Sequence, residues 1–116
     1  MLDKYDLDSL RYYLCASTSF GADVNFSEPA LIAMHNSELA DILGNLVHRI
    51  LNLCIKYCGG CIPDAPHDPA FPPPFDLPAL LVETARNLEA CTIHANLFKA
   101  MDAARSTNRS ASVILN

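Results

Sequence analysis

The chain has 116 residues, of which 51% are hydrophobic and 18% charged, and its formal net charge is -5 at pH 7. This length allows one domain with its own core, and this composition excludes disorder over most of the chain. The negative charge argues against generic binding to nucleic acid, which depends on basic surface, although a few side chains can still read a few bases. Five cysteines without a signal peptide indicate a reduced, cytoplasmic chain, and no apolar run is long enough to span a membrane.

The first predicted helix covers residues 7–16, with Asp6 as the residue that caps its amino end. A second start signal stands at Ser27, whose hydroxyl can cap a helix, and Pro29 follows in the first turn, where a missing N–H costs nothing. This signal predicts a short helix that ends near Asn36.

A long amphipathic helix is predicted for residues 37–57, closed by the conformationally permissive Gly59 and Gly60. At helical spacing its apolar residues form one broad face, made of Leu39, Ile42, Leu43, Leu46, Val47, Ile50, Leu53 and Cys54. The other side carries a polar stripe, made of Glu38, Asp41, Asn45, Arg49, Asn52 and Lys56. The simplest interpretation of such a stripe alone is a solvated face.

The remaining sequence predicts an extended connector and two further helices. Prolines crowd residues 61–76, and neither a helix nor a sheet interior tolerates that density. Asp76 then caps a third helix over residues 77–94, and Asn96 begins a fourth that reaches residue 109. Since no strand pattern occurs, we predict an all-α fold, a small antiparallel helical bundle.

Three cysteines raise the question of a metal site. Cys54, Cys58 and Cys61 have the spacing of an iron–sulfur motif, and a zinc site would take His67 as its fourth ligand. However, Cys54 and Cys58 belong to the end of an amphipathic helix, where cysteine serves as a small apolar side chain. We therefore predict no metal site, with iron–sulfur or zinc binding as a remote alternative. The sequence also shows no nucleophile elbow and no glycine-rich phosphate loop, so we predict no catalytic residue.

Asn45 and Arg49 of the polar stripe are four residues apart and project from one side of the helix. An amide beside a guanidinium can read base edges and hold a nucleic-acid backbone, and unpaired loop bases are the usual target of sequence-specific RNA recognition. This geometry permits RNA binding. An ion pair of Arg49 within the bundle is the alternative.

The order of several short motifs resembles methionyl-tRNA synthetases, over residues 5–63. Residues 5–14 (YDLDSLRYYL) resemble the Y-G-x-D-A-L-R-Y-Y-L segment that follows the K-M-S-K-S loop of this family. The family's F-S and N-S-x-L-A motifs match residues 26–40, and its L-G-N-L-V-N-R motif matches residues 43–49. Its K-Y-F-G-G-x-V-P motif matches residues 56–63, and the likeness is looser from residue 77 to 109.

The resemblance implies a division of the chain. Residues 1–25 would form the junction that follows the catalytic domain, and residues 26–109 an incomplete anticodon-binding bundle of the class I synthetase type. The connector 61–76 would lie inside this bundle, and residues 110–116 would form a divergent tail. The resemblance also assigns Asn45 and Arg49 to the CAU anticodon of tRNA(Met), and it places Arg11 at the domain junction with a buried ion-pair partner.

The sequence also departs from the family. The H-I-G-H and K-M-S-K-S motifs are absent, so the resemblance predicts no site for methionine or for ATP with Mg²⁺ in this chain, which would be an inactive fragment of an aminoacylating enzyme. The family's base-stacking Pro-Trp pair is absent as well, since the chain has no tryptophan.

We therefore expect weak binding of tRNA(Met) through the anticodon side. The alternative function is a helical protein-interaction module that no longer binds RNA, with other components of a synthetase complex, or a second copy of the chain, as partners. Self-association would occur through the uncovered apolar faces of the long and third helices.

Overall fold

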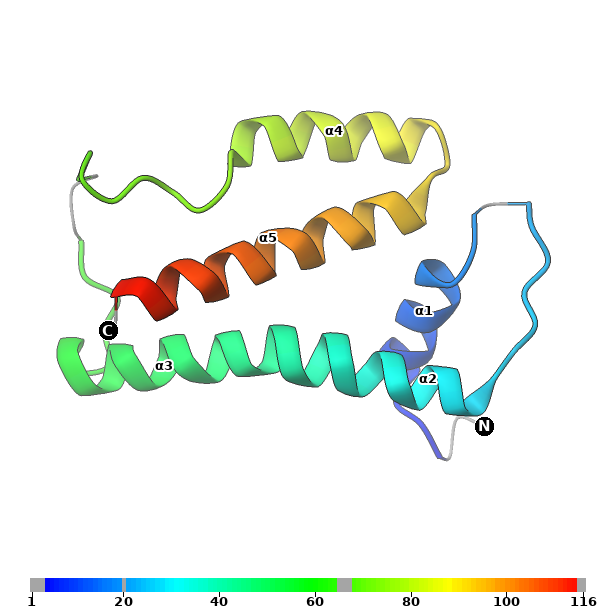
Figure 1. Ribbon diagram of the computed structural model, residues 1–116, viewed down its shortest axis with the longest axis horizontal. Helices are drawn as coiled ribbons and strands as arrows, with labels where there is room; N and C mark the ends of the chain where they lie inside the picture. Colours follow the sequence, from blue (N-terminus) through cyan, green and yellow to red (C-terminus); the bar gives the residue numbers. More distant parts are fainter. Residues whose placement is uncertain (1–3, 20, 65–67, 115–116) are drawn as a thin grey trace.

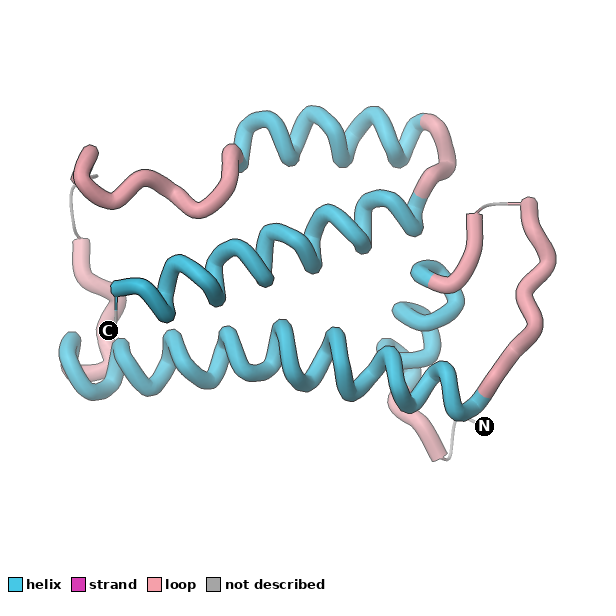
Figure 2. The backbone as a smooth tube through the Cα atoms, viewed as in Figure 1, coloured by secondary structure: helices cyan, strands magenta, loops and turns pink. Residues whose placement is uncertain are grey.

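Helices make up all the regular structure that the computed structural model describes, which covers residues 4–19, 21–64 and 68–114 (Figures 1 and 2). The elements are α1 (Leu7–Ala16), α2 (Glu28–Met34), the π-helix η1 (His35–Gly44), α3 (Asn45–Cys58), α4 (Leu77–Glu89) and α5 (Ile93–Ile114). Within these residues there is no strand, and the predicted all-α helical bundle is confirmed.

The predicted starts of α1, α2 and α4 are confirmed by the hydrogen bonds of their capping residues. The Asp6 side chain accepts from backbone N–H groups in the first turn of α1, and Ser27 does the same for α2. Asp76 Oδ1 accepts from the N–H of Ala79 at 3.0 Å at the start of α4. Gly59 ends α3 in the left-handed conformation with a φ of 62°. Each signal acts within one turn of the chain, which is why the sequence alone reveals it.

The predicted break near Asn36 is wrong, because the backbone stays helical without interruption over residues 28–58 (Figure 1). Met34 and His35, where α2 meets η1, both have right-handed helical φ and ψ. The middle of this long helix is wound as the π-helix η1, whose i to i+5 hydrogen bonds place more residues in each turn than an α-helix has. A uniform rotation of 100° per residue therefore does not describe residues 35–44.

Two boundaries near the carboxyl end also differ from the prediction. α4 ends at Glu89, and the left-handed Cys91, with a φ of 57°, turns the chain into α5. Asn96 caps nothing; it lies inside α5, where its side chain donates to the carbonyl of Thr84 and so ties α5 to α4. Residues 110–112, predicted as a frayed tail, belong to α5.

The long helices alternate in direction along the chain. Residues 28–58 run one way, α4 returns, and α5 runs the first way again (Figure 1). α4 packs against α5 and does not reach α3. The long helix therefore has the parallel helix α5 as its neighbour, and Glu38 faces Arg105 on one level while Arg49 faces Ser112 further along.

The core lies around α1, which packs against α2 and against the middle of α5. Its buried apolar residues are Tyr13, Leu31, Met101 and Ala104. The hydroxyl of Tyr13 accepts from the N–H of Ser27 at 3.2 Å, and its ring meets Phe26 edge to face at 5.7 Å between centroids. The polar Ser9 is also buried, and its Oγ lies 2.9 Å from His35 Nδ1.

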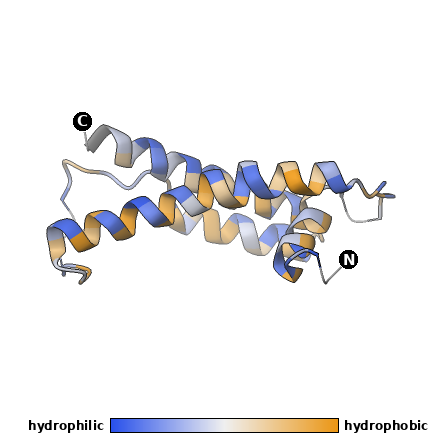
Figure 3. Ribbon diagram, turned by 90° about the horizontal axis from the view of Figure 1, so that it is seen from below, coloured by the Kyte–Doolittle hydropathy of each residue, from blue (hydrophilic) through white to orange (hydrophobic). Residues whose placement is uncertain are grey.

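Away from this core, α3 and α4 leave much of their apolar surface uncovered. Figure 3 shows how apolar and polar positions alternate along the helices. Exposed apolar residues include Val47, Ile50, Leu51 and Ile55 on α3, and Leu77, Leu81, Val82 and Leu88 on α4. The Cα radius of gyration is 17.0 Å, against about 13 Å for a compact domain of this length. The expected exposure of the long and third helices is confirmed, and self-association through them stays a prediction. None of the described helices is long and apolar enough to cross a membrane.

Candidate nucleic-acid interface

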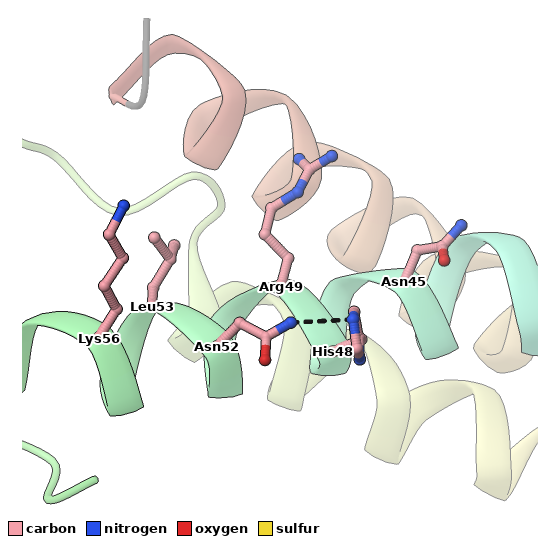
Figure 4. Close-up of a pocket in the computed structure, with 6 residues that line it drawn as sticks. All are labelled: Asn45, His48, Arg49, Asn52, Leu53 and Lys56. Carbon is pink, nitrogen blue, oxygen red and sulfur yellow. Dashed lines mark hydrogen bonds between the residues drawn. The ribbon is translucent and has the colours of Figure 1, made fainter. Parts of the chain in front are cut away.

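The two residues predicted to bind RNA lie on consecutive turns of α3 and line one open pocket (Figure 4). The pocket has a volume of about 520 Å³, and its other lining residues are His48, Asn52, Leu53 and Lys56. Every one of these residues belongs to α3, so the pocket is a hollow along one helix face. The structure therefore places Asn45 and Arg49 together at a solvent-accessible surface.

Arg49 is the most constrained side chain of the pocket. Its Nη1 donates to Ser112 Oγ at 2.9 Å and to the carbonyl of Asn108 at 3.4 Å, both on α5. The side chain is half-buried between the two helices, and Figure 4 shows it directed toward α5. These bonds use one nitrogen of a group that has five N–H donors, and within the described residues Nη2 and Nε make no hydrogen bond.

The other polar groups of the pocket are exposed. The amide of Asn45 makes no hydrogen bond within the described part of the chain. Asn52 Nδ2 and His48 Nε2 lie 2.8 Å apart, which links two successive turns of α3 (Figure 4). Near the end of the helix, Lys56 Nζ lies 4.9 Å from the centroid of the Tyr57 ring. The pocket thus offers two amides, an imidazole and two cations along one helix face.

The charge of this region differs from that of the whole chain. Residues 45–62 contain Arg49 and Lys56 and no acidic residue, and residues 103–114 of α5 contain Arg105 and Arg109 and no acidic residue. The hydrogen bonds of Arg49 show that the two segments face each other. An overall charge of -5 therefore coexists with one basic region, the acid-free region of α3 and α5. Such a region can attract phosphate although the whole chain repels it.

Glu38 is the first residue of the predicted polar stripe and lies at the boundary of this region. Its carboxylate contacts side chains of two neighbouring helices, α1 and α5. Its carboxylate pairs with Arg105 Nη2 at 3.4 Å and accepts from the hydroxyl of Tyr12. Burial, and then the hydrogen bond to Glu38, raise the pKa of the Tyr12 phenol far above its usual range. The stripe is therefore not one solvated face, because Glu38 and Arg49 contact neighbouring helices while Asn45, Asn52 and Lys56 face solvent.

Two further expectations can be compared with the structure. The ion-pair partner of Arg11 is Asp8, at 3.1 Å, and both side chains are exposed, so the expectation of a buried partner is wrong. Cys54 is half-buried while Cys58 and Cys61 are exposed, and the described residues include no cluster of three or more side chains that could hold a metal ion. His67 lies outside the described residues.

Sequence reasoning missed the α5 half of this interface. Asn108 and Ser112 approach Arg49 from segments 59 and 63 residues away, and Ser112 belongs to the segment predicted as a frayed tail. No local pattern indicates such a contact. His48 and Asn52 had a usable signal, since residues four apart on a helix are neighbours.

Comparison with known proteins identifies a family of similar sequences. Residues 1–51 match a family model described as tRNA synthetases class I (M). Over 63 residues the chain is 44% identical to a methionine–tRNA ligase of Caldanaerobacter subterraneus subsp. tengcongensis, which covers 54% of this chain and 10% of that protein. Over 89 residues it is 38% identical to the methionine–tRNA ligase of Halalkalibacterium halodurans, which covers 77% of this chain and 13% of that protein.

The Brucella suis methionine–tRNA ligase is 40% identical over 63 residues, which are 54% of this chain and 12% of that protein. The matching sequence and the helical bundle together define a segment of a class I tRNA synthetase. The chain belongs to the methionyl-tRNA synthetase family, and it spans about a tenth of the length of the curated relatives that it matches.

Proposed function

We propose that this chain binds tRNA(Met) by its anticodon loop through the exposed polar face of α3. One observation carries the proposal: Asn45 and Arg49 share an open pocket in the acid-free region. An amide can bond a base edge bidentately, and a guanidinium can bond a base or a phosphate. The proposal gives this chain no part in amino-acid activation with ATP and Mg²⁺, and it places the protein with translation in the cytoplasm.

The net charge of the chain limits how strong this binding can be. Few cations face the RNA, so few counterions would be released, and the affinity should depend only weakly on salt. The base contacts would then supply a large share of the selectivity, with each bidentate contact worth roughly 1–3 kcal/mol. The proposal therefore predicts weak binding that discriminates between anticodons.

Filter binding with two RNAs tests the proposal directly. One is an anticodon stem–loop with CAU, and the other is the same stem–loop with a changed anticodon. We expect Asn45→Ala to reduce the preference for CAU about tenfold, because the amide reads a base. Arg49→Lys keeps the charge but loses the planar fork, so it should lower the affinity for the CAU stem–loop more than for the variant RNA.

Matched controls come from the same residue types outside the acid-free region. Asn36 is exposed on η1 and Arg86 is exposed on α4, so Asn36→Ala and Arg86→Ala should leave the preference for CAU unchanged. Equal retention of both RNAs by the wild-type chain would defeat the proposal.

The uncovered apolar side chains of α3 and α4 favour a second candidate function, a helical protein-interaction module. Exposed apolar surface of this kind marks association sites in other proteins. In this case the chain would associate with itself or with a protein partner, and it would retain both stem–loops equally. Sedimentation of the chain over a range of concentrations, beside the filter assay, separates the two candidates.

A further inference from the structure

The contact between Arg49 and α5 is built from two acceptors that converge on one nitrogen. Arg49 Nη1 donates to Ser112 Oγ at 2.9 Å and to the Asn108 carbonyl at 3.4 Å. The Ser112 hydroxyl in turn donates to the same carbonyl at 2.9 Å. Since its own proton goes to Asn108, the oxygen of Ser112 turns its lone pairs toward the guanidinium. Neither acceptor carries a charge, so the arginine keeps its full positive charge toward solvent.

Holding one nitrogen fixes the plane of the whole guanidinium. A free arginine side chain has many rotamers and loses this freedom when it binds a ligand, which weakens binding. Here Nη2 and Nε remain as donors on a group whose position is set before any ligand arrives. The arrangement therefore fits a ligand with paired acceptors in one plane, such as the edge of an unpaired base or a phosphate.

Asn108, whose carbonyl accepts from Arg49, also forms a hydrogen bond with the end of the π-helix η1. Its side-chain Nδ2 donates to the carbonyl of Ile42 at 3.0 Å, close to the point where η1 gives way to α3. Asn45 begins α3, and Arg49 follows one turn later. Asn108 thus fixes the same helical junction that sets the direction of Asn45, and π-helical segments often occur at functional sites.

We propose that Ser112 and Asn108 are positioning residues, which hold the Arg49 guanidinium for an unpaired base of an RNA loop. This inference rests on the proposed function. It differs from a purely structural role, in which the same hydrogen bonds would only join α3 to α5 and their loss would lower stability without changing the choice of RNA.

Substitution of Ser112 tests the inference in the full 116-residue chain. Ser112→Ala removes the hydroxyl, and Ser112→Thr keeps it. The matched control is Ser106→Ala, because Ser106 Oγ accepts from Arg109 Nη2 at 3.0 Å on the exposed side of the same helix. For each protein, filter binding gives the affinity for the CAU stem–loop and for the changed stem–loop, and thermal unfolding gives the stability.

We expect Ser112→Ala to reduce the preference for CAU by about fivefold to tenfold, the scale of one lost hydrogen bond to a charged group. Its affinity for the changed stem–loop should stay the same. Ser112→Thr should restore the preference, and Ser106→Ala should leave it at the wild-type level.

The outcomes separate this inference from the function on which it rests. If the wild-type chain prefers CAU and Ser112→Ala prefers it equally, Ser112 does not position Arg49, while the proposed function stands. If Ser112→Ala lowers only the unfolding temperature, its role is structural and the inference is overturned. If the wild-type chain shows no preference, the proposed function and this inference both fail.

Discussion

The two ends of the long helix, residues 28–58, differ in how much of their surface is covered. At the amino end Leu31 is 2% exposed, since α1 and α2 pack together there, and α5 lies against η1 further along, where Arg105 pairs with Glu38. At the carboxyl end Leu51 is 56% exposed, because α5 is the neighbour of α3 and touches it along a short stretch. One helix thus contributes its buried residue, Leu31, near its amino end and exposes most of its surface over α3. The candidate RNA-binding residues belong to the accessible half.

This difference teaches that stability and recognition are separated along one helix. Helical stability in proteins comes mainly from packing of the apolar face, so the covered end should carry most of the free energy of folding. The other end can then expose polar groups for a ligand without weakening the core. Each experiment below compares a residue of the covered end with a similar residue of the exposed end.

Leucine substitutions should give the largest contrast. We expect Leu31→Ala to lower the free energy of unfolding by about 3 kcal/mol, since it removes buried methyl groups and leaves a cavity. Leu51→Ala should cost less than about 1 kcal/mol because its side chain is already hydrated. Urea unfolding followed by circular dichroism measures both. Equal losses would show that α3 is covered in solution and would contradict the comparison.

Removal of a tyrosine hydroxyl should have an intermediate effect. Tyr13 is 4% exposed, and its hydroxyl accepts from the N–H of Ser27. Tyr13→Phe would leave that N–H without its partner, at a cost of about 1–2 kcal/mol. On α3, Tyr57 is 67% exposed, so Tyr57→Phe should change the stability by less than about 0.5 kcal/mol. A larger loss from Tyr57→Phe than from Tyr13→Phe would count against this assignment of the core.

The capping aspartates should differ in how far their effects spread. Asp6→Ala and Asp76→Ala each remove an N-cap, worth about 1 kcal/mol. α1 packs against α2 and α5, so we expect Asp6→Ala to speed amide exchange in all three helices. α4 packs against α5 alone, so faster exchange after Asp76→Ala should be confined to α4 and α5 and should leave α1 and α2 unchanged. Hydrogen exchange monitored by NMR reports each amide, and uniform acceleration throughout the chain in both variants would refute the distinction.

The smallest expected effect concerns pH. Hydrogen bonds from Lys4 and then Tyr5 lower the pKa of Glu28 below its usual value of 4.5. The unfolded chain then binds this proton more readily than the folded chain, so the contribution is present above about pH 4.5 and is lost as the pH falls through the folded pKa. Because the groups are exposed, the effect should be small. Stability measured against pH should fall less steeply in acid for Glu28→Gln than for wild type, and parallel curves would rule out this contribution.

Much of the local structure could be predicted from the sequence because its causes are local. Asp6, Ser27 and Asp76 each accept a hydrogen bond from an N–H two or three residues ahead, and Gly59 needs only its own freedom at positive φ. The motifs of residues 5–63 likewise indicated the family that the comparisons identify, and Asn45 and Arg49 were placed on one helix face by spacing alone.

Contacts between distant segments decided the features that no local sequence signal predicts. The helix over residues 28–58 is continuous, although the sequence predicted a break near Asn36. Its π-helical segment contacts α5 through Glu38 and the carbonyl of Ile42, whose partners are 67 and 66 residues away in sequence. The same holds for Arg49, whose acceptors lie on a part of α5 predicted to be frayed. The sequence by itself determined where α1, α2 and α4 begin and which family the chain belongs to. Only packing between distant segments decided which side chains are free for a ligand and which are held in place.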